Sequence, residues 1–229
     1  MRSRGRKGGF FSDWKRVALV AGAGGVLLAV AIILLLRLNA PKAPEEVPPN
    51  PVATITMSDG SQMRFTLYPD QAPNTVANFI SLSNRGFYDG QEFFRIVAGV
   101  FIQSGDPKNN GTGDAGYAIA GEFADNGFER NTVSHMRGAI SMARPSGYDT
   151  AGSQFFIMQG SYPEYDGRYA AFGSIDENDA QSLAVLDAIA SQPTDSTYLP
   201  LTRQVIGTIR VETFGVDYGE PATLDRDAQ

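Results

Sequence analysis

The stretch Phe93–Pro107, FFRIVAGVFIQSGDP, indicates the fold more clearly than any other part of the chain. Two β-rich runs flank Ala98-Gly99, and this pattern predicts two short strands joined by a bend. Arg95 is the one charge within these runs, and Gln103 follows it shortly before the turn Ser104–Pro107. An arginine in such a strand either faces solvent, which is the commoner case for a run taken alone, or is held at a functional site.

Three further runs follow in order: AISMA at 139–143, GSQFFI at 152–157 and DGRYAAFG at 166–173. Together with FxRxxxGxxxQxGD at 93–106, their order and spacing resemble the cyclophilins, a family of peptidyl-prolyl cis–trans isomerases. The resemblance extends from about residue 52 to about residue 211. Several spaced motifs in a fixed order are a far more specific signal than one short motif.

Alternating polar and apolar residues predict strands outside the first stretch, and two longer apolar periodicities predict helices at 74–84 and 178–190. Many short strands with two distant helices favour a closed antiparallel barrel over α/β alternation. The resemblance sharpens this to a mainly β fold, a closed eight-stranded antiparallel β-barrel capped by two α-helices. The expected domain is 52–214, followed by an acidic, mobile tail at 215–229. The further predicted strands are 52–57, 63–68, 139–143, 154–158, 170–175 and 204–211.

The N-terminal region predicts a membrane anchor at 17–38. Its residues 17–36 carry no charge, and at ~1.5 Å per residue twenty residues span roughly 30 Å, the thickness of a bilayer core. Basic side chains cluster in 1–16, so the positive-inside rule places this end in the cytoplasm. A cleaved signal peptide is disfavoured because the apolar run is long and Leu38-Asn39-Ala40 is a poor cleavage site. A stiff proline-rich linker, 39–51, then leads to an extracytoplasmic domain of a single-pass cell-membrane protein.

Composition excludes several classes of function. From residue 39 onward, 24 acidic side chains outnumber 12 basic ones, so nucleic acid is not an expected partner. The chain has no cysteine and one histidine, which argues against thiol chemistry and against a histidine-rich or thiolate metal site. No metal and no cofactor are expected. His135, in a polar connection, is predicted to be a surface residue and not a catalyst.

The resemblance implies catalysis of rotation about X–Pro bonds in proline-containing polypeptides. The uncatalysed barrier is ~18–20 kcal/mol because rotation breaks amide resonance. In the twisted transition state the proline nitrogen regains a lone pair, so the reaction needs a donor, a ring pocket and fixed carbonyls, but no nucleophile. Arg95 matches the catalytic arginine of the family, and Gln103 matches the residue that orients it.

The resemblance also implies a substrate-binding set. Phe101 and Phe156 match positions of the proline pocket, with Tyr165 at its rim; taken alone, either phenylalanine is as readily ordinary core. Ala143 and Arg144 match an edge that pairs with the peptide backbone. The remaining matched positions are Gln154, which contacts the peptide backbone, Gly111 in a glycine-rich loop bordering the groove, Tyr169 at the ring edge, and Val100.

The sequence departs from the family pattern at several of these positions. Phe94 replaces the usual histidine, Arg144 the usual asparagine, Tyr169 a frequent histidine, and Val100 an aromatic residue of the pocket. Because of Val100, a non-catalytic proline-peptide binding module anchored at the membrane stays as an alternative to the enzyme. Glu164 replaces the tryptophan that cyclosporin-sensitive members carry, so cyclosporin binding is predicted to be weak.

Overall fold

A computed structural model describes residues 48–225 of the chain. The predicted anchor at 17–38 and the linker up to residue 47 lie outside the described residues, so both stay predictions. Within 48–225, none of the helices combines the length and the apolar character needed to cross a bilayer. The family-like domain predicted from residue 52 onward falls entirely within the described part up to residue 225.

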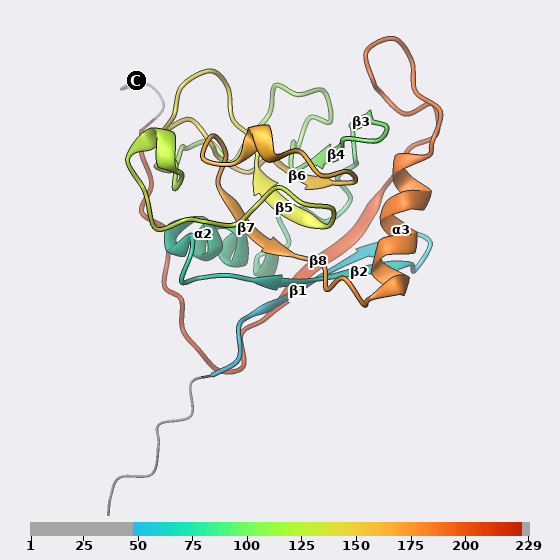
Figure 1. The fold of residues 1–229 in the computed structure, drawn as a ribbon. Coiled ribbons are helices and arrows are strands. Elements are labelled where there is room, and N and C mark those ends of the chain that lie inside the picture. Colours follow the sequence, from blue (N-terminus) through green and yellow to red (C-terminus); the bar gives the residue numbers. More distant parts are fainter. Residues whose placement is uncertain (1–47, 226–229) are drawn as a thin grey trace, which may run out of the picture. The chain divides into compact units, whose positions relative to one another are not determined.

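Eight antiparallel strands form one curled sheet in the order β3-β4-β6-β5-β7-β2-β1-β8 (Figure 1). The predicted strands are confirmed to within two residues at each end, and Ala98-Gly99 is the bend between β3 and β4. Gly99 has a φ of +80°, a conformation that glycine adopts without steric cost. The strands are β1 Val52–Met57, β2 Gln62–Leu67, β3 Arg95–Val97, β4 Phe101–Ser104, β5 Ala139–Met142, β6 Phe155–Met158, β7 Ala171–Ser174 and β8 Ile206–Glu212.

The two edge strands of the sheet, β3 and β8, do not pair along their length. The contact that joins the two edges lies in the residues just before each strand. Glu92 and Val205 form an isolated antiparallel bridge, and the Phe93 N–H donates to the Gln204 carbonyl at 2.9 Å. The sheet is therefore a curled half-barrel whose edges are joined through a short contact, which is a looser closure than the fully closed barrel that was expected.

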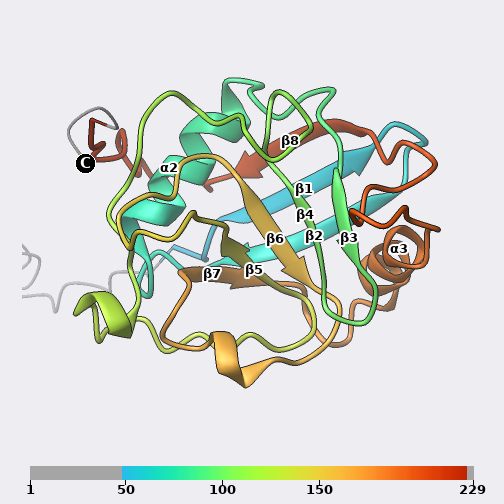
Figure 2. The same ribbon diagram turned by 90° about the horizontal axis from the view of Figure 1, so that it is seen from above.

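Two helices cover opposite ends of the sheet, α2 Pro73–Asn84 and α3 Ala180–Ala190 (Figure 2). The expected cap of α2 at Asn74 or Thr75 is wrong, because Pro73 already occupies the first turn. The N–H groups of Asn74 and Thr75 instead donate to the buried carboxylate of Glu122, at 3.0 and 2.8 Å. A side chain 47 residues away thus satisfies donors that a helix start leaves unpaired.

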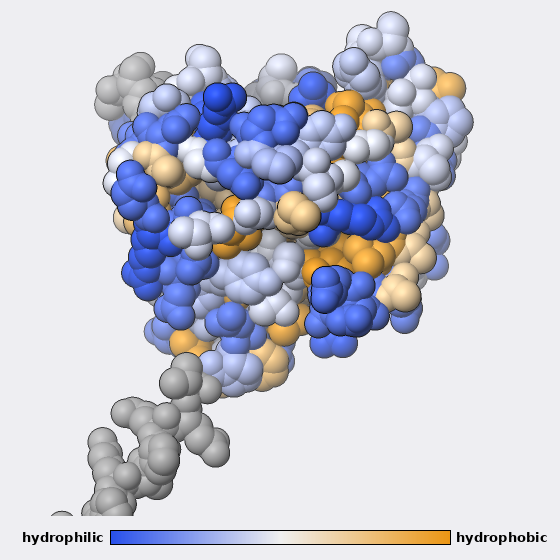
Figure 3. Space-filling model, viewed as in Figure 1, coloured by the Kyte–Doolittle hydropathy of each residue, from blue (hydrophilic) through white to orange (hydrophobic). Residues whose placement is uncertain are grey.

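The C-terminal segment is bound to the domain as far as it is described. Ala118 and Leu224 form an antiparallel bridge with backbone hydrogen bonds of 3.0 and 2.7 Å. The Asn74 amide exchanges two hydrogen bonds with the backbone of Ala222. The prediction of a mobile tail is therefore wrong for 215–225. Figure 3 shows a mostly hydrophilic face, with apolar residues gathered over α3.

Candidate active site

The site lies on the outer face of four neighbouring strands. In antiparallel ladders, directly opposed residues point to the same face of the sheet. Arg95 on β3 opposes Gln103 on β4, which opposes Phe156 on β6, which opposes Ser141 on β5. A strand neighbour of each of these residues turns into the core, and these neighbours are Ile96, Ile102, Ile157 and Ile140, each at most 1% exposed.

The outward row opens into a pocket of about 240 Å³. Aromatic rings form its floor and wall: Phe156 packs at 5.5 Å from Phe101, and edge-to-face at 5.5 Å from Tyr169 and 6.1 Å from Tyr165. A proline ring is apolar and compact, so this pocket suits it in size and character. The lining residues are Arg95, Phe101, Gln103, Ala143, Arg144, Phe156, Tyr165 and Tyr169, all of them predicted site residues.

A chain of amide hydrogen bonds orients Arg95 at the mouth of this pocket. The Gln154 Nε2 donates to the carbonyls of Gly113 and Gly111, at 2.8 and 3.2 Å. Its Oε1 then accepts from Gln103 Nε2 at 2.9 Å, and Gln103 Oε1 accepts from Arg95 Nη1 at 3.3 Å. Since each amide presents one donor and one acceptor end, this relay fixes the direction of both glutamines.

The glycine-rich loop at the end of the relay is held by a buried carboxylate. Asp106 accepts hydrogen bonds from the backbone N–H groups of Lys108 at 2.7 Å, Asn110 at 3.0 Å and Gly111 at 2.5 Å. Burial raises the pKa of Asp106, but these backbone donors outweigh burial and leave the pKa below its ordinary value. A Cβ at Gly113 would collide with the same carboxylate, so the loop requires glycine there.

A second hollow of about 420 Å³ adjoins the pocket and brings the other predicted contacts together. Gly111 and Gln154 line it, and it shares Gln103, Ala143 and Arg144 with the aromatic pocket. The Ala143 N–H already donates to the Gln154 carbonyl at 2.9 Å. The hollow thus continues the groove past the C-terminal end of β5, where an extended peptide could run.

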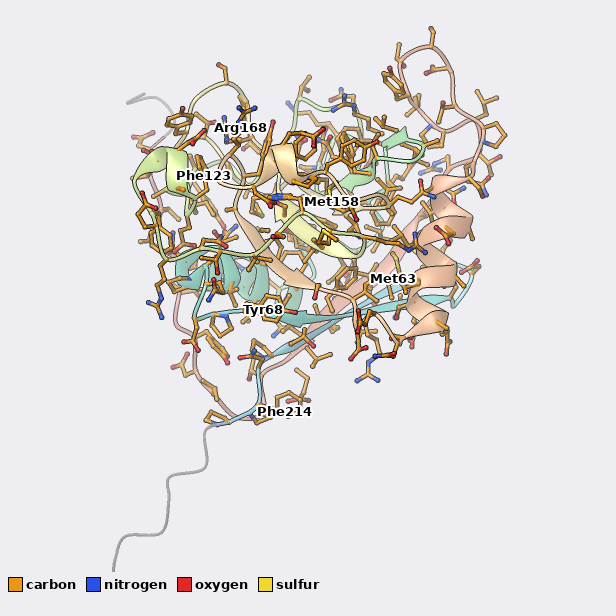
Figure 4. The ribbon with its side chains drawn as sticks, viewed as in Figure 1. Met63, Tyr68, Phe123, Met158, Arg168 and Phe214 are labelled. Carbon is orange, nitrogen blue, oxygen red and sulfur yellow. The ribbon has the colours of Figure 1, made fainter. Side chains whose placement is uncertain are left out.

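Arg144 has a structural task in addition to its place on the groove. Its guanidinium lies over the rings of Tyr169, Phe123 and Tyr148 at 4.9 to 5.2 Å. Its Nη2 donates to the Arg168 carbonyl at 2.9 Å, and Figure 4 shows Phe123 and Arg168 on the same side of the domain. The side chain therefore ties two loops together beside the pocket.

Val100 is the one predicted site residue that does not line either hollow. It is half-buried and packs against the small apolar cluster that contains Phe101 and Phe156. Its carbonyl accepts from the N–H groups of Gln159 and Gly160, at 2.8 and 3.2 Å. Val100 therefore contributes to the packing next to the pocket and not to its lining.

The expectation that His135 is a surface residue is wrong, because its ring is buried behind the pocket. The ring stacks on Phe156 at 5.9 Å. Its Nδ1 donates to the Asp166 carboxylate at 2.9 Å, which leaves Nε2 to accept from the Ser141 hydroxyl at 3.0 Å. Burial lowers the pKa of His135, although the bond to Asp166 and its charge act in the opposite direction.

The Asp166–His135–Ser141 arrangement has the connectivity of a nucleophilic triad but not its accessibility. Ser141 is 0% and His135 1% exposed, so no substrate reaches the hydroxyl. These residues support the pocket from behind and carry out no acyl transfer. Sequence reasoning missed them because Asp166 is 31 positions from His135 and no local pattern links the two.

Comparison with known proteins points to one family. The family model described as "Cyclophilin type peptidyl-prolyl cis-trans isomerase/CLD" matches residues 52–211. Peptidyl-prolyl cis-trans isomerase B of Bacillus subtilis is 45% identical over 119 residues, covering 52% of this chain and 79% of that protein. A peptidyl-prolyl cis-trans isomerase of Helicobacter pylori is 41% identical over 145 residues, covering 63% and 83%.

A solved structure gives the same result at the level of the fold. The cyclophilin-type isomerase of Cryptosporidium parvum, crystallised in the presence of the dipeptide Ala-Pro, superposes with a TM-score of 0.61 at 29% identity. The match covers 70% of this chain and 98% of that one. An eight-stranded half-barrel, an aromatic pocket with an arginine at its mouth and a family match across most of the domain lead to one conclusion: the chain belongs to the cyclophilin-type peptidyl-prolyl cis–trans isomerases.

Proposed function

We propose that this isomerase stabilises the twisted X–Pro bond mainly through Arg95. The observation that carries the proposal is the position of its guanidinium, which lies over the Phe101 ring and is hydrogen-bonded to Gln103 at the pocket mouth. A guanidinium there can donate to the lone pair that the proline nitrogen regains, an interaction absent from the planar ground state. Phe101, Phe156 and Tyr165 would hold the proline ring.

The flanking peptide would lie along the second hollow, beside Ala143 and Arg144, with Gln154 and Gly111 near its backbone. Crystallisation of the Cryptosporidium relative in the presence of Ala-Pro supports a proline-containing ligand. Small residues such as Gly111 allow a peptide backbone to approach closely. Because rotation needs no electron transfer and no metal, the proposed mechanism uses only these side chains.

The isomerase domain is proposed to lie outside the cytoplasm and to act there on polypeptides that are still folding. Support comes from the uncharged residues 17–36, the six basic side chains against one acidic side chain in 1–16, and the prolines of 39–51. These features together are typical of a single-pass anchor with a cytoplasmic N-terminus and a stiff external spacer. X–Pro isomerisation in a chain that is folding takes tens of seconds without a catalyst.

Protease treatment of intact cells tests this topology. A C-terminal tag on the full chain reports whether external protease cuts the linker and releases an active domain of slightly less than 200 residues. A variant whose six basic residues in 1–16 are replaced by serine is the matched control, and its domain should become protected in part of the population. Complete protection of the wild-type domain until the cells are lysed would overturn the proposed orientation without affecting the assignment of isomerase activity.

A further inference from the structure

The loop 193–201, between α3 and β8, is hydrogen-bonded to β3, the strand that carries Arg95. Figure 1 shows it as the orange loop that rises next to β3. The N–H of Ile96, the neighbour of Arg95, donates to the Tyr198 carbonyl at 2.9 Å. The loop itself is closed by a bridge between Thr194 and Pro200. This hydrogen bond thus holds a segment about a hundred residues later in the chain next to β3.

Tyr198 adopts a backbone conformation that its residue type disfavours. Its φ is +68°, in the left-handed region where glycine and asparagine are common and bulky residues are rare. Hydrogen bonds hold it there: the Asp195 carboxylate accepts from the N–H groups of Thr197 and Leu199, at 2.8 and 3.0 Å. Strain of this kind persists where the surroundings over-determine it, and it gathers at functional sites.

The strained backbone places an aromatic ring against Arg95. The guanidinium carbon of Arg95 lies over the Tyr198 ring at 5.8 Å from its centroid, and over the Phe101 ring at 5.1 Å. Burial of the Tyr198 ring does not account for the strained backbone, since the residue is 47% exposed. Tyr198 thus contributes a contact to this guanidinium from outside the β3–β4 hairpin.

We propose that Tyr198 is a positioning residue for Arg95. Its ring attracts the guanidinium electrostatically and limits the rotamers that the long side chain can adopt. Phe101 and Gln103 contact Arg95 from β4, and Tyr198 adds a contact from the loop. The inference rests on the role proposed above for Arg95, and it adds that the loop after α3 tunes the catalytic rate.

Four variants of the full chain in detergent test it. Tyr198→Asn and Tyr198→Gly remove the ring while fitting the left-handed backbone, so they should fold at least as well as the wild type. Tyr198→Phe keeps the ring and should retain wild-type activity. Phe214→Asn is the matched control, because Phe214 has a φ of +53° and is 48% exposed, and Figure 4 shows it far from the loop, at the foot of the domain.

We expect kcat/KM to fall roughly two- to fivefold in Tyr198→Asn and Tyr198→Gly, with KM unchanged and Phe214→Asn fully active. In an Arg95→Ala background, Tyr198→Asn should cause no further loss. Unchanged activity in both ring-less variants would overturn the proposal, as would a loss that Tyr198→Phe shares or that persists without Arg95. Full activity of Arg95→Ala itself would instead refute the role of Arg95.

Discussion

The side chain of Arg95 points outward because of the alternation along β3, and three contacts hold it in place. Gln103 accepts a hydrogen bond from it, and the rings of Phe101 and Tyr198 lie beneath its guanidinium. A planar cation with several donors suits both kinds of contact at once, whereas a lysine ammonium would keep neither the stacking nor the fork geometry. The site is therefore built around orientation of a permanent charge and not around a titrating group.

Glu164 provides a test of the groove rim at the scale of one residue. It is exposed in the short 3-10 helix Pro163–Tyr165, next to Tyr165 of the pocket. Family resemblance implies a tryptophan here in cyclosporin-sensitive members, whose indole N–H binds the drug. A carboxylate lacks that donor and opposes an apolar ligand, which should weaken binding roughly a hundredfold or more.

Titration of isomerase activity with cyclosporin tests the predicted weak binding. We expect weak inhibition of the wild type, stronger inhibition of Glu164→Trp, and little gain in Glu164→Gln, which removes the charge without adding an indole. Inhibition of the wild type at low nanomolar concentration would show that the correspondence of Glu164 is wrong.

Single residues also show where prediction from sequence stops. Arg95 and Gln103 were predictable because they match positions of the family motif at 93–106, and the structure makes them opposed neighbours. His135 was not, since its hydrogen-bond partner Asp166 is 31 positions away. Tyr198 gave no signal either: a strained φ is a property of the folded loop, and the amino-acid sequence around it contains no glycine to mark the turn.

At the scale of elements, the family resemblance predicted which residues form the site, and alternation along the strands explains why those on β3, β4 and β6 share one face. On β3, β4, β5 and β6 an isoleucine turns inward and a polar or aromatic neighbour turns outward. This two-residue period is visible in the sequence. Helix starts were less predictable: the cap of α2 comes from Glu122, whose carboxylate accepts from Asn74 and Thr75.

The loop 106–113 is the element whose rigidity the mechanism uses, because its carbonyls orient Gln154. In Asp106→Asn the new amide would face backbone donors with a donor of its own, leaving N–H groups of the loop unpaired. We expect a loss of about 1–3 kcal/mol in the free energy of unfolding, together with reduced kcat/KM. Denaturant unfolding at neutral pH measures the first quantity.

Asp59→Asn is the matched control for this variant, since Asp59 accepts local hydrogen bonds from Ser61 in an exposed turn. Its effect on stability should be clearly smaller than that of Asp106→Asn, and its activity unchanged. Equal stability of Asp106→Asn and the wild type would contradict the role given to this carboxylate.

At the scale of the whole molecule, long-range contacts determine what sequence patterns leave open. The half-barrel is joined at Glu92 and Val205, and the segment to residue 225 is bound through Ala118 and Asn74. Each contact joins segments more than 90 positions apart, and no local periodicity encodes such a pair. The acidic composition of the C-terminal segment suggested solvation, whereas its backbone groups pair with the domain.

The pH dependence of stability follows from the single histidine of the chain. The pKa of His135 is lowered in the folded protein by burial, so below about pH 6.5 the unfolded chain binds a proton that the folded one resists. Stability should therefore be retained above pH 6.5 and decrease as the pH falls from there towards the lowered pKa. The lowered pKa of Asp166 adds a further loss only below about pH 4.

Thermal unfolding of the wild type and of His135→Asn between pH 8 and pH 5 checks this. The variant should be less stable at pH 8, and its melting temperature should change less between pH 7 and pH 5. Parallel curves for the two proteins in that range would mean that His135 does not account for the acid sensitivity.

The most direct test of the central claim is a proline-isomerisation assay that compares the wild type with Arg95→Ala. The account predicts that the variant stays folded, as judged by its melting temperature, because the side chain is exposed. Its kcat/KM should fall about a hundredfold, equivalent to roughly 3 kcal/mol of lost transition-state stabilisation. A folded Arg95→Ala protein with the turnover of the wild type would contradict the account.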